Sequence, residues 1–171
     1  MPIIVEDGTG LPNANSFTSV SYADVYFSDR QVQAWASLTT PAKEAALIKA
    51  TDYIVLWFSN QFKGAQKTEE QGLPFPRVQT GLPTEMPAQL LKATCEYAVR
   101  AASAPLNDDV TVDSTGQIIQ KLVERVGPIE DETTYHVPSE LSFVGKRRPI
   151  PAADGLMKFL LRNTGGGVIR N

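Results

Sequence analysis

Two helical patterns separated by a helix-breaking stretch constrain this fold more than any other feature of the sequence. The first pattern begins at Thr40, a favourable N-cap, and the proline that follows suits the first helical position. The second begins at Pro87 and stops before Pro105. Between them, residues 62–86 contain several glycines and prolines, which exclude a continuous helix. Residues 40–104 are therefore predicted to form an antiparallel helical hairpin joined by a long crossing.

The apolar residues of both patterns recur three or four positions apart, as on a helix with one buried face. The second helix has small residues that let another helix approach closely, so the two stripes are expected to pack on each other. The predicted fold class is mainly α: a small α-helical bundle around the antiparallel helical hairpin, with a β-hairpin or extended segment and long N- and C-terminal arms. The first stripe comprises Leu47, Ile48, Thr51, Ile54, Val55 and Phe58, and the second Leu90, Leu91, Thr94, Tyr97, Ala98 and Ala101.

The chain before the hairpin divides into an arm and a short helix. Residues 1–20 mix apolar residues with glycine, proline and asparagine, so they are predicted to form an extended N-terminal arm. Residues 21–105 are predicted to form the helical core. Its first helix is expected to run from Ser21, whose hydroxyl can cap the first turn, to Arg30. Trp35 is expected to follow in a linking turn.

The crossing is expected to contain one helical turn at Thr68 and extended backbone over residues 71–77, where prolines push the preceding residues out of the helical region. Exposed aromatic side chains could stack on nucleic-acid bases, but stacking sites also need interleaved cations, which are sparse in the sequence. We therefore expect most of the aromatic residues to lie in the core. These are Trp35, Trp57, Phe58, Phe62, Phe75 and Tyr97.

Residues 106–137 carry two opposing signals after a polar, acidic start that is typical of an exposed loop. Apolar residues within 117–126 match helical spacing. The Gly127-Pro128 turn and the Thr- and Tyr-containing run that follows it instead favour a β-hairpin. Strand and helix both stay open for residues 117–126, and a loop followed by a β-hairpin is the prediction for the region.

Residues 138–171 are predicted to form a basic C-terminal arm with a short helix near residues 154–162. Apolar side chains surround that helix almost completely, so it is expected to bury against another surface. Residues 1–137 carry 10 Lys and Arg against 17 Asp and Glu, a net charge of −7, whereas residues 138–171 carry 6 against 2, a net charge of +4. An acidic body and a basic tail suggest different partners.

The residue counts exclude several classes of chemistry. Cys95 is the only cysteine and His136 the only histidine, which excludes an internal disulfide and zinc sites that need two such ligands from this chain. Cys95 is expected in the core, and His136 in a solvated acidic turn. No nucleophile or acid–base constellation is recognisable, so the chain is predicted to be no enzyme and to need no cofactor or metal. No apolar run reaches the length of a membrane span, and a cytosol-like location without a membrane partner is expected.

Five sequence segments, taken in order, carry a resemblance to a known family. They are VEDGTGLPNANSF, SYADVYFSDR, AWASLTTPAKEAALIKATDYI, FKGAQKTEEQGLPFPR and LPTEMPAQLLKATCEYAVRA. With these segments, the chain resembles tailed-bacteriophage head-to-tail adaptor (connector) proteins, some of whose relatives are labelled DnaT-like single-stranded DNA-binding proteins. The likeness covers roughly residues 5–105 and, more loosely, a Val-Gly-Pro turn further on.

The resemblance implies a structural virion protein. Copies would form a ring of about twelve under the portal protein at the genome-exit vertex and present a docking surface for tail or nozzle proteins. Double-stranded DNA would pass through the lumen without specific binding, which suits a net-negative body. The ring would be assembled in the host cytoplasm and reside at the head-tail interface of the virion.

Apolar segments that lack a local core are the candidates for contacts with the portal or with neighbouring subunits, together with the basic run of the tail. These candidates are Ile3, Ile4, Val5, Lys146, Arg147, Arg148, Leu156, Met157, Phe159, Leu160 and Leu161. The alternative function takes the DnaT-like label literally and makes the chain a single-stranded DNA-binding protein. That function would use Lys146, Arg147, Arg148, Arg162 and Arg170.

Overall fold

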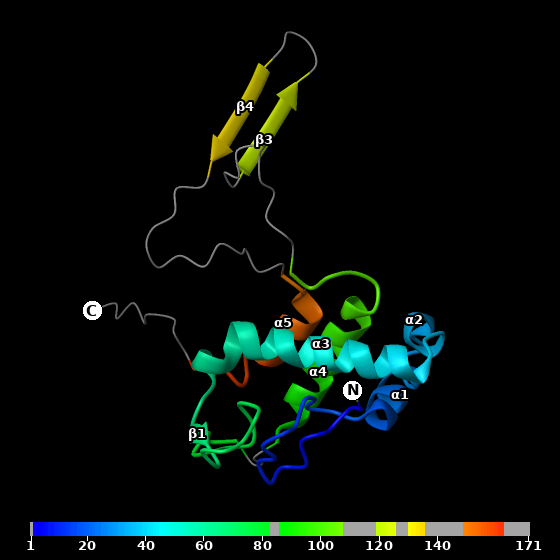
Figure 1. Cartoon of the computed structure of the whole chain (residues 1–171), viewed down its shortest axis with the longest axis vertical. Coiled ribbons are helices and arrows are strands. Elements are labelled where there is room, and N and C mark those ends of the chain that lie inside the picture. The colour runs from blue at the N-terminus through cyan, green and yellow to red at the C-terminus, as the bar shows by residue number, and fades with distance from the viewer. Residues whose placement is uncertain (1, 83–85, 108–118, 126–129, 136–148, 163–171) are drawn as a thin grey trace, which may run out of the picture. The chain divides into compact units, whose positions relative to one another are not determined.

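The computed structural model is mainly helical and divides into two compact units (Figure 1). Unit 1 comprises Met1–Leu106 and Pro149–Asn171, and unit 2 comprises Asn107–Arg148. The fold class predicted from the sequence is therefore confirmed. The structure describes residues 2–82, 86–107, 119–125, 130–135 and 149–162.

The predicted helical hairpin forms the centre of unit 1. Helix α3 spans Thr40–Phe58 and helix α4 spans Ala88–Ala101, and the two pack on each other (Figure 1). Helix α3 begins one residue earlier than expected, with Thr39 as its N-cap. The predicted stripes face the core, since Leu47 and Tyr97 are fully buried. Apolar positions between the stripes add to that core, because Ala46, Ala50, Tyr53 and Ala93 are buried as well.

The short helix before the hairpin starts earlier than the sequence suggested. Helix α1 spans Val20–Ser28, and the Oγ of Ser19 accepts the backbone N–H of Tyr22 at 3.1 Å. The prediction of Ser21 as the cap was therefore wrong. Ser19 and Ser21 stand two residues apart and serine suits an N-cap, but Ser21 lies inside the first turn of the helix. A further helix, α2 (Gln33–Ala36), holds Trp35 in the core where a turn was expected.

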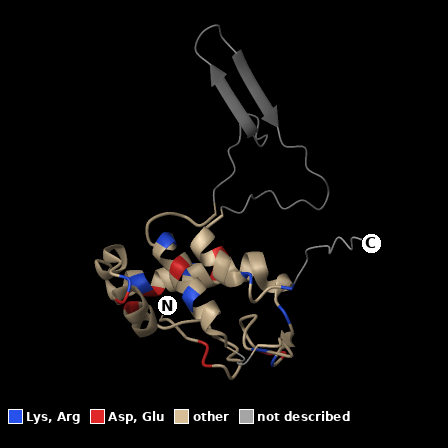
Figure 2. Ribbon diagram, turned by 180° about the vertical axis from the view of Figure 1, so that it is seen from behind, with Lys and Arg blue, Asp and Glu red and all other residues tan. Residues whose placement is uncertain are grey.

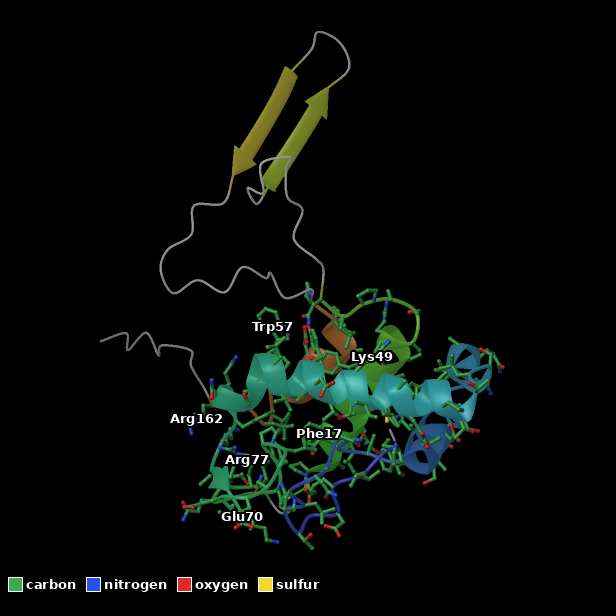
Figure 3. The ribbon with its side chains drawn as sticks, in the orientation of Figure 1. Phe17, Lys49, Trp57, Glu70, Arg77 and Arg162 are labelled. Atoms are coloured by element: carbon green, nitrogen blue, oxygen red, sulfur yellow. The ribbon has the colours of Figure 1, made fainter. Side chains whose placement is uncertain are left out.

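The N-terminal residues pack against the rest of unit 1. Phe17 is 1% exposed and its N–H donates to the Oγ1 of Thr51 in α3 at 3.3 Å. Figure 3 shows Phe17 lying under α3. A parallel bridge joins Val5 to Ser16, so the segment folds back on itself. Bends and a turn interrupt this segment, and its buried side chains, such as Phe17, are part of the core of unit 1.

The crossing between the helices is compact rather than looped out. Strands β1 (Ala65–Gln66) and β2 (Arg77–Val78) pair antiparallel. Gly64 must be glycine because its φ is +72° and a Cβ there would lie 2.1 Å from the carbonyl oxygen of Val78. The helical turn expected at Thr68 does not form, since the Gln71 side chain accepts its backbone N–H at 3.0 Å and holds the segment irregular.

The C-terminal part of unit 1 returns to the hairpin. Helix α5 spans Pro151–Met157 and packs on α4. It begins earlier and is shorter than the helix predicted over residues 154–162. The Tyr97 hydroxyl donates to an Oδ1 of Asp154 at 2.5 Å and joins the two helices. Met157 and Leu160 are buried, so the surface that covers this helix belongs to the same chain.

Unit 2 contains an antiparallel hairpin of two strands, β3 (Ile119–Arg125) and β4 (Glu130–Tyr135). The register pairs Leu122 with Thr133 and Arg125 with Glu130, with an irregularity between Ile119 and Lys121. The hairpin prediction is confirmed and residues 119–125 are not helical. The apolar spacing that suggested a helix was too short a pattern to separate the two structures. His136 and the run Lys146–Arg148 lie outside the described residues.

Candidate nucleic-acid interface

Two segments distant in sequence meet at the end of α3. Phe62 and Leu161 form an antiparallel bridge. The N–H of Lys63 donates to the carbonyl of Leu160 at 3.0 Å, and the N–H of Arg162 donates to the carbonyl of Gln61 at 2.7 Å. The start of the crossing and the segment after α5 are thus fixed side by side by backbone hydrogen bonds.

This pairing brings cationic side chains together. The Nζ of Lys63 donates to the carbonyl of Phe159 at 2.9 Å, and the Nε of Arg162 donates to the carbonyl of Phe62 at 3.0 Å. Each contact occupies one N–H of a side chain that carries several, so both cations keep donors for another ligand. Lys158, which ends α5, is also exposed. Figure 2 shows Lys and Arg segments at this end of unit 1.

Arg77 is buried close to Lys63 and Arg162 and organises the backbone around them. Its Nε and Nη2 donate to the carbonyls of Lys63 and Gly64 at 2.7 and 2.6 Å, and its Nη1 donates to the carbonyl of Pro74 at 3.2 Å. Burial lowers the pKa of Arg77, and the nearby positive charge of Arg162 lowers it further. Figure 3 shows Arg77 and Arg162 at the same end of the unit.

The basic cluster is defined here as Lys63, Arg77 and Arg162, which these contacts bring together, and Lys158, which directly precedes Phe159 in the sequence. Among the residues that the structure describes, no carboxylate forms an ion pair with any of them, whereas Lys43 does pair with Asp24 at 2.8 Å. Positive charges that are held close without a carboxylate favour an anionic ligand, because its binding removes their mutual repulsion. The cluster is therefore suited to phosphate groups.

One aromatic ring stands beside the basic cluster. Phe159 is 65% exposed, and its own carbonyl is the acceptor for Lys63. The neighbouring Met157 and Leu160 are buried. Of the aromatic side chains that the structure describes outside the hairpin of unit 2, Phe159 alone is exposed.

A second feature of unit 1 is an open cavity of about 440 Å³ between α1, α2 and the start of α3. Asp24 lies in it and accepts from the Nε1 of Trp35 at 2.7 Å and from the Nζ of Lys43 at 2.8 Å. The hydrogen bond from Lys43 lowers the pKa of Asp24, although desolvation works in the opposite direction. Trp35 is only 1% exposed. The polar groups of this cavity therefore satisfy one another and tie the three helices together.

The structure distributes the predicted contact residues over very different environments. Ile3, Ile4, Val5, Leu156 and Leu161 are half-buried in unit 1, and Met157 and Leu160 are buried there. Only Phe159 among the described candidates presents its side chain to solvent. Of the cations assigned to the alternative function, Arg162 is described and belongs to the basic cluster. Lys146, Arg147, Arg148 and Arg170 lie outside the described residues.

Sequence reasoning missed Lys63 and Arg77 as members of a site. They stand 14 residues apart in the crossing. Arg162 follows Lys63 by 99 residues and Arg77 by 85, which is further than any local sequence pattern reaches. No spacing rule predicts such a long-range meeting. In the crossing, an aromatic residue closely precedes each of these cations, in the tripeptides Phe62-Lys63-Gly64 and Phe75-Pro76-Arg77. These tripeptides were the sequence signal from which the two residues could have been assigned to a site.

Two further observations bear on other chemistry. Cys95 is buried, as expected, and burial raises the pKa of its thiol to about 12, with the charge of Glu96 adding to the effect. Such a thiol is a poor nucleophile at neutral pH. Within the described residues, no helix is both long enough and apolar enough to cross a membrane.

Comparison with known proteins agrees with one part of the resemblance noted in the sequence. The family model that matches the chain is described as "Putative DnaT-like ssDNA binding protein", and the match covers residues 1–171. No curated protein and no solved structure matches the chain. Because the family model spans every residue of the sequence, the chain belongs to the DnaT-like single-stranded DNA-binding protein family.

Proposed function

We propose that this protein binds single-stranded DNA and that the basic cluster of unit 1 contacts the phosphates. The observation that carries the proposal is the meeting of Lys63, Arg77 and Arg162 without a carboxylate partner among the described residues. The family description over the whole chain supports the same function. Cations that neutralise phosphates release counterions, and this release supplies most of the affinity in binding that does not depend on sequence.

The overall charge restricts where DNA can bind. The chain has a formal net charge of −3, so DNA is repelled from much of its surface and is attracted only where cations gather. The exposed members of the basic cluster are Lys158 and Arg162, with Lys63 half-buried beside them. Arg77 already bonds three carbonyls, so its role is to position Lys63 and the backbone and to contribute positive potential.

The test is a titration of a fluorescently labelled oligothymidine with the full chain, followed by fluorescence anisotropy at several salt concentrations. We expect binding that weakens steeply with salt, with a log–log slope of roughly −0.7 for each phosphate neutralised. The double variant Lys63→Gln with Arg162→Gln should weaken binding at least tenfold and make the slope shallower. Lys49→Gln is the matched control, because Lys49 is an exposed lysine on α3 (Figure 3).

Two results would overturn the proposal. The first is an absence of binding by the unmodified chain at low salt. The second is an equal loss of affinity in the Lys49→Gln control and in the double variant, since that would indicate a diffuse charge effect rather than a site.

A structural adaptor role is a second candidate, with one observation in its favour. Val25 and Leu56 are 63% and 53% exposed on two different helices of unit 1, and such side chains can be buried by neighbouring copies. In this role, about twelve copies would form a ring at the head-tail interface of a phage, between the portal protein and the tail or nozzle proteins. Native mass measurement and negative-stain imaging test it. A ring supports the adaptor role, and a monomer that neither assembles nor binds a portal contradicts it.

A further inference from the structure

We infer that Phe159 is a base-stacking residue that makes the basic cluster select single strands over duplex DNA. The inference rests on the proposed function, which concerns the phosphates, and adds the group that contacts the bases. It names a residue, a ligand group and a selectivity that phosphate contacts alone do not provide.

The exposure of Phe159 is specific to this position. The ring is 65% exposed, whereas Met157 and Leu160 on either side are 0% and 1% exposed. Met157 and Leu160 therefore fill the core at this point, and the Phe159 side chain lies outside it. A large apolar ring that stands in water gains free energy when a flat apolar partner covers it.

The backbone that carries the ring is held in place. The carbonyl of Phe159 accepts from the Nζ of Lys63 at 2.9 Å, and the next carbonyl, that of Leu160, accepts from the backbone N–H of Lys63 at 3.0 Å. The N–H of Leu160 in turn donates to the carbonyl of Met157 at 2.9 Å. A stacking partner thus meets a platform whose backbone is already ordered, which lowers the entropic cost of binding.

The surroundings of the ring fit a nucleotide better than an apolar partner. Lys158 precedes Phe159 directly, Lys63 bonds its carbonyl, and Arg162 lies three residues further on. A nucleotide presents a flat base beside a phosphate, so one aromatic ring between cations matches its two parts. Val25 and Leu56, the other large apolar side chains that are exposed in the described residues, have no aromatic face.

Selection against duplex follows from the geometry of the two forms of DNA. In a single strand the faces of the bases are accessible, so a base can turn onto Phe159 while its phosphate contacts the basic cluster. In a duplex each base is stacked and paired, and exposing one face costs a few kcal/mol of unstacking. Removal of the ring should therefore reduce binding to single strands and leave duplex binding nearly unchanged.

The test compares variants of the full chain on a labelled oligothymidine and on a duplex of equal length. Phe159→Ala should weaken single-strand binding about tenfold and duplex binding less than twofold. Phe159→Leu keeps an apolar side chain without the aromatic face and should behave like Phe159→Ala, whereas Phe159→Tyr should retain the affinity of the unmodified chain. Val25→Ala is the control for loss of an exposed apolar side chain. Circular dichroism melting checks that each variant is folded.

A spectroscopic readout reports on the stack itself. Phe159→Trp should bind like the unmodified chain, and stacking on a base should quench the fluorescence of the introduced indole. The two native tryptophans, Trp35 and Trp57, give the background, which is measured on the unmodified chain under the same conditions.

The outcomes separate this inference from the proposed function. If Phe159→Ala binds single strands as well as the unmodified chain while the Lys63→Gln and Arg162→Gln double variant does not, the stacking role is wrong and the phosphate site stands. If the unmodified chain binds no DNA, the proposed function itself fails. If Phe159→Ala changes the oligomeric mass but not DNA binding, the ring contacts another copy of the chain and the inference is overturned.

Discussion

Arg77 shows how a single side chain can determine the shape of the candidate site. Arg77 is 7% exposed, and its guanidinium donates to the carbonyls of Lys63, Gly64 and Pro74. The planar fork of arginine reaches separate acceptors in fixed directions, which a lysine ammonium cannot do. The residue therefore fixes where Lys63 stands relative to the segment after α5.

Replacement of Arg77 should destabilise unit 1. Arg77→Ala leaves three carbonyls without their charged donor, and we expect the free energy of unfolding to fall by about 3 kcal/mol. Arg77→Lys should recover less than half of that loss, because it restores the charge without the fork. Urea unfolding monitored by circular dichroism measures both. The surface control Lys49→Ala should change stability by no more than about 0.5 kcal/mol, and an Arg77→Ala effect of that size would contradict the structural role.

Cys95 predicts a distinctive dependence on alkaline pH. Its pKa is raised from 9.0 to about 12 in the folded chain, first by burial and then by Glu96. Above pH 9 the unfolded thiol loses its proton while the folded thiol keeps it, so the unfolded state binds fewer protons. The stability of the fold should therefore fall as the pH rises from about 9 to 12. Cys95→Ala would remove this contribution, and equal slopes for the two proteins in urea unfolding across this range would disprove it.

At the scale of single elements, Ser19 before α1 and Ser21 within its first turn offer a direct test of the helix boundary. Ser19 caps the helix through the N–H of Tyr22 at 3.1 Å, whereas the Ser21 hydroxyl forms a hydrogen bond with the hydroxyl of Ser19 at 2.9 Å. Ser19→Ala should lower the free energy of unfolding by about 1 kcal/mol, because an N–H of the first turn loses its acceptor. Ser21→Ala is the matched control and should have a much smaller effect. A larger effect of Ser21→Ala in thermal unfolding would reassign the cap.

The elements that the sequence predicted well are those with a long local pattern. The stripes of α3 and α4 repeat over several turns, and residues such as Leu47 and Tyr97 were assigned correctly because helical spacing alone placed them. Residues 119–125 were ambiguous, because their three apolar residues, Ile119, Leu122 and Val123, are too few to distinguish a strand from a helix.

The candidate site was harder to predict because it depends on contacts between distant segments. The pairing of Lys63 with Leu160 joins the two sequence segments of unit 1, and no periodicity encodes such a pairing. The exposure of Phe159 could not be predicted either. In the sequence it belongs to an apolar run in which Met157 and Leu160 are buried, and only the turn after α5 separates their environments.

At the scale of the whole molecule, unit 2 is an excursion that leaves unit 1 at Leu106 and returns at Pro149. The helices on either side of the excursion, α4 and α5, pack on each other. Unit 1 therefore has its own core, and the basic cluster lies entirely within it. The contribution of unit 2 to the proposed DNA binding can therefore be tested by removing unit 2 from the chain.

Replacement of residues 107–148 by a short glycine- and serine-rich linker should leave unit 1 folded. We expect cooperative thermal unfolding by circular dichroism and an affinity for oligothymidine within about threefold of the full chain, since the phosphate contacts proposed above are retained. A variant that folds but no longer binds would instead assign the main contacts to the removed segment, which includes Lys146, Arg147 and Arg148.

The position of α5 also has a consequence for how the protein is made. Translation delivers α3, α4 and the whole of unit 2 before it delivers α5 and the segment after it, yet Met157 and Leu160 are part of the same core as α4. A nascent chain that stops before residue 150 exposes part of that core and lacks the partners of Lys63. The basic cluster is consequently complete only on chains translated through Arg162.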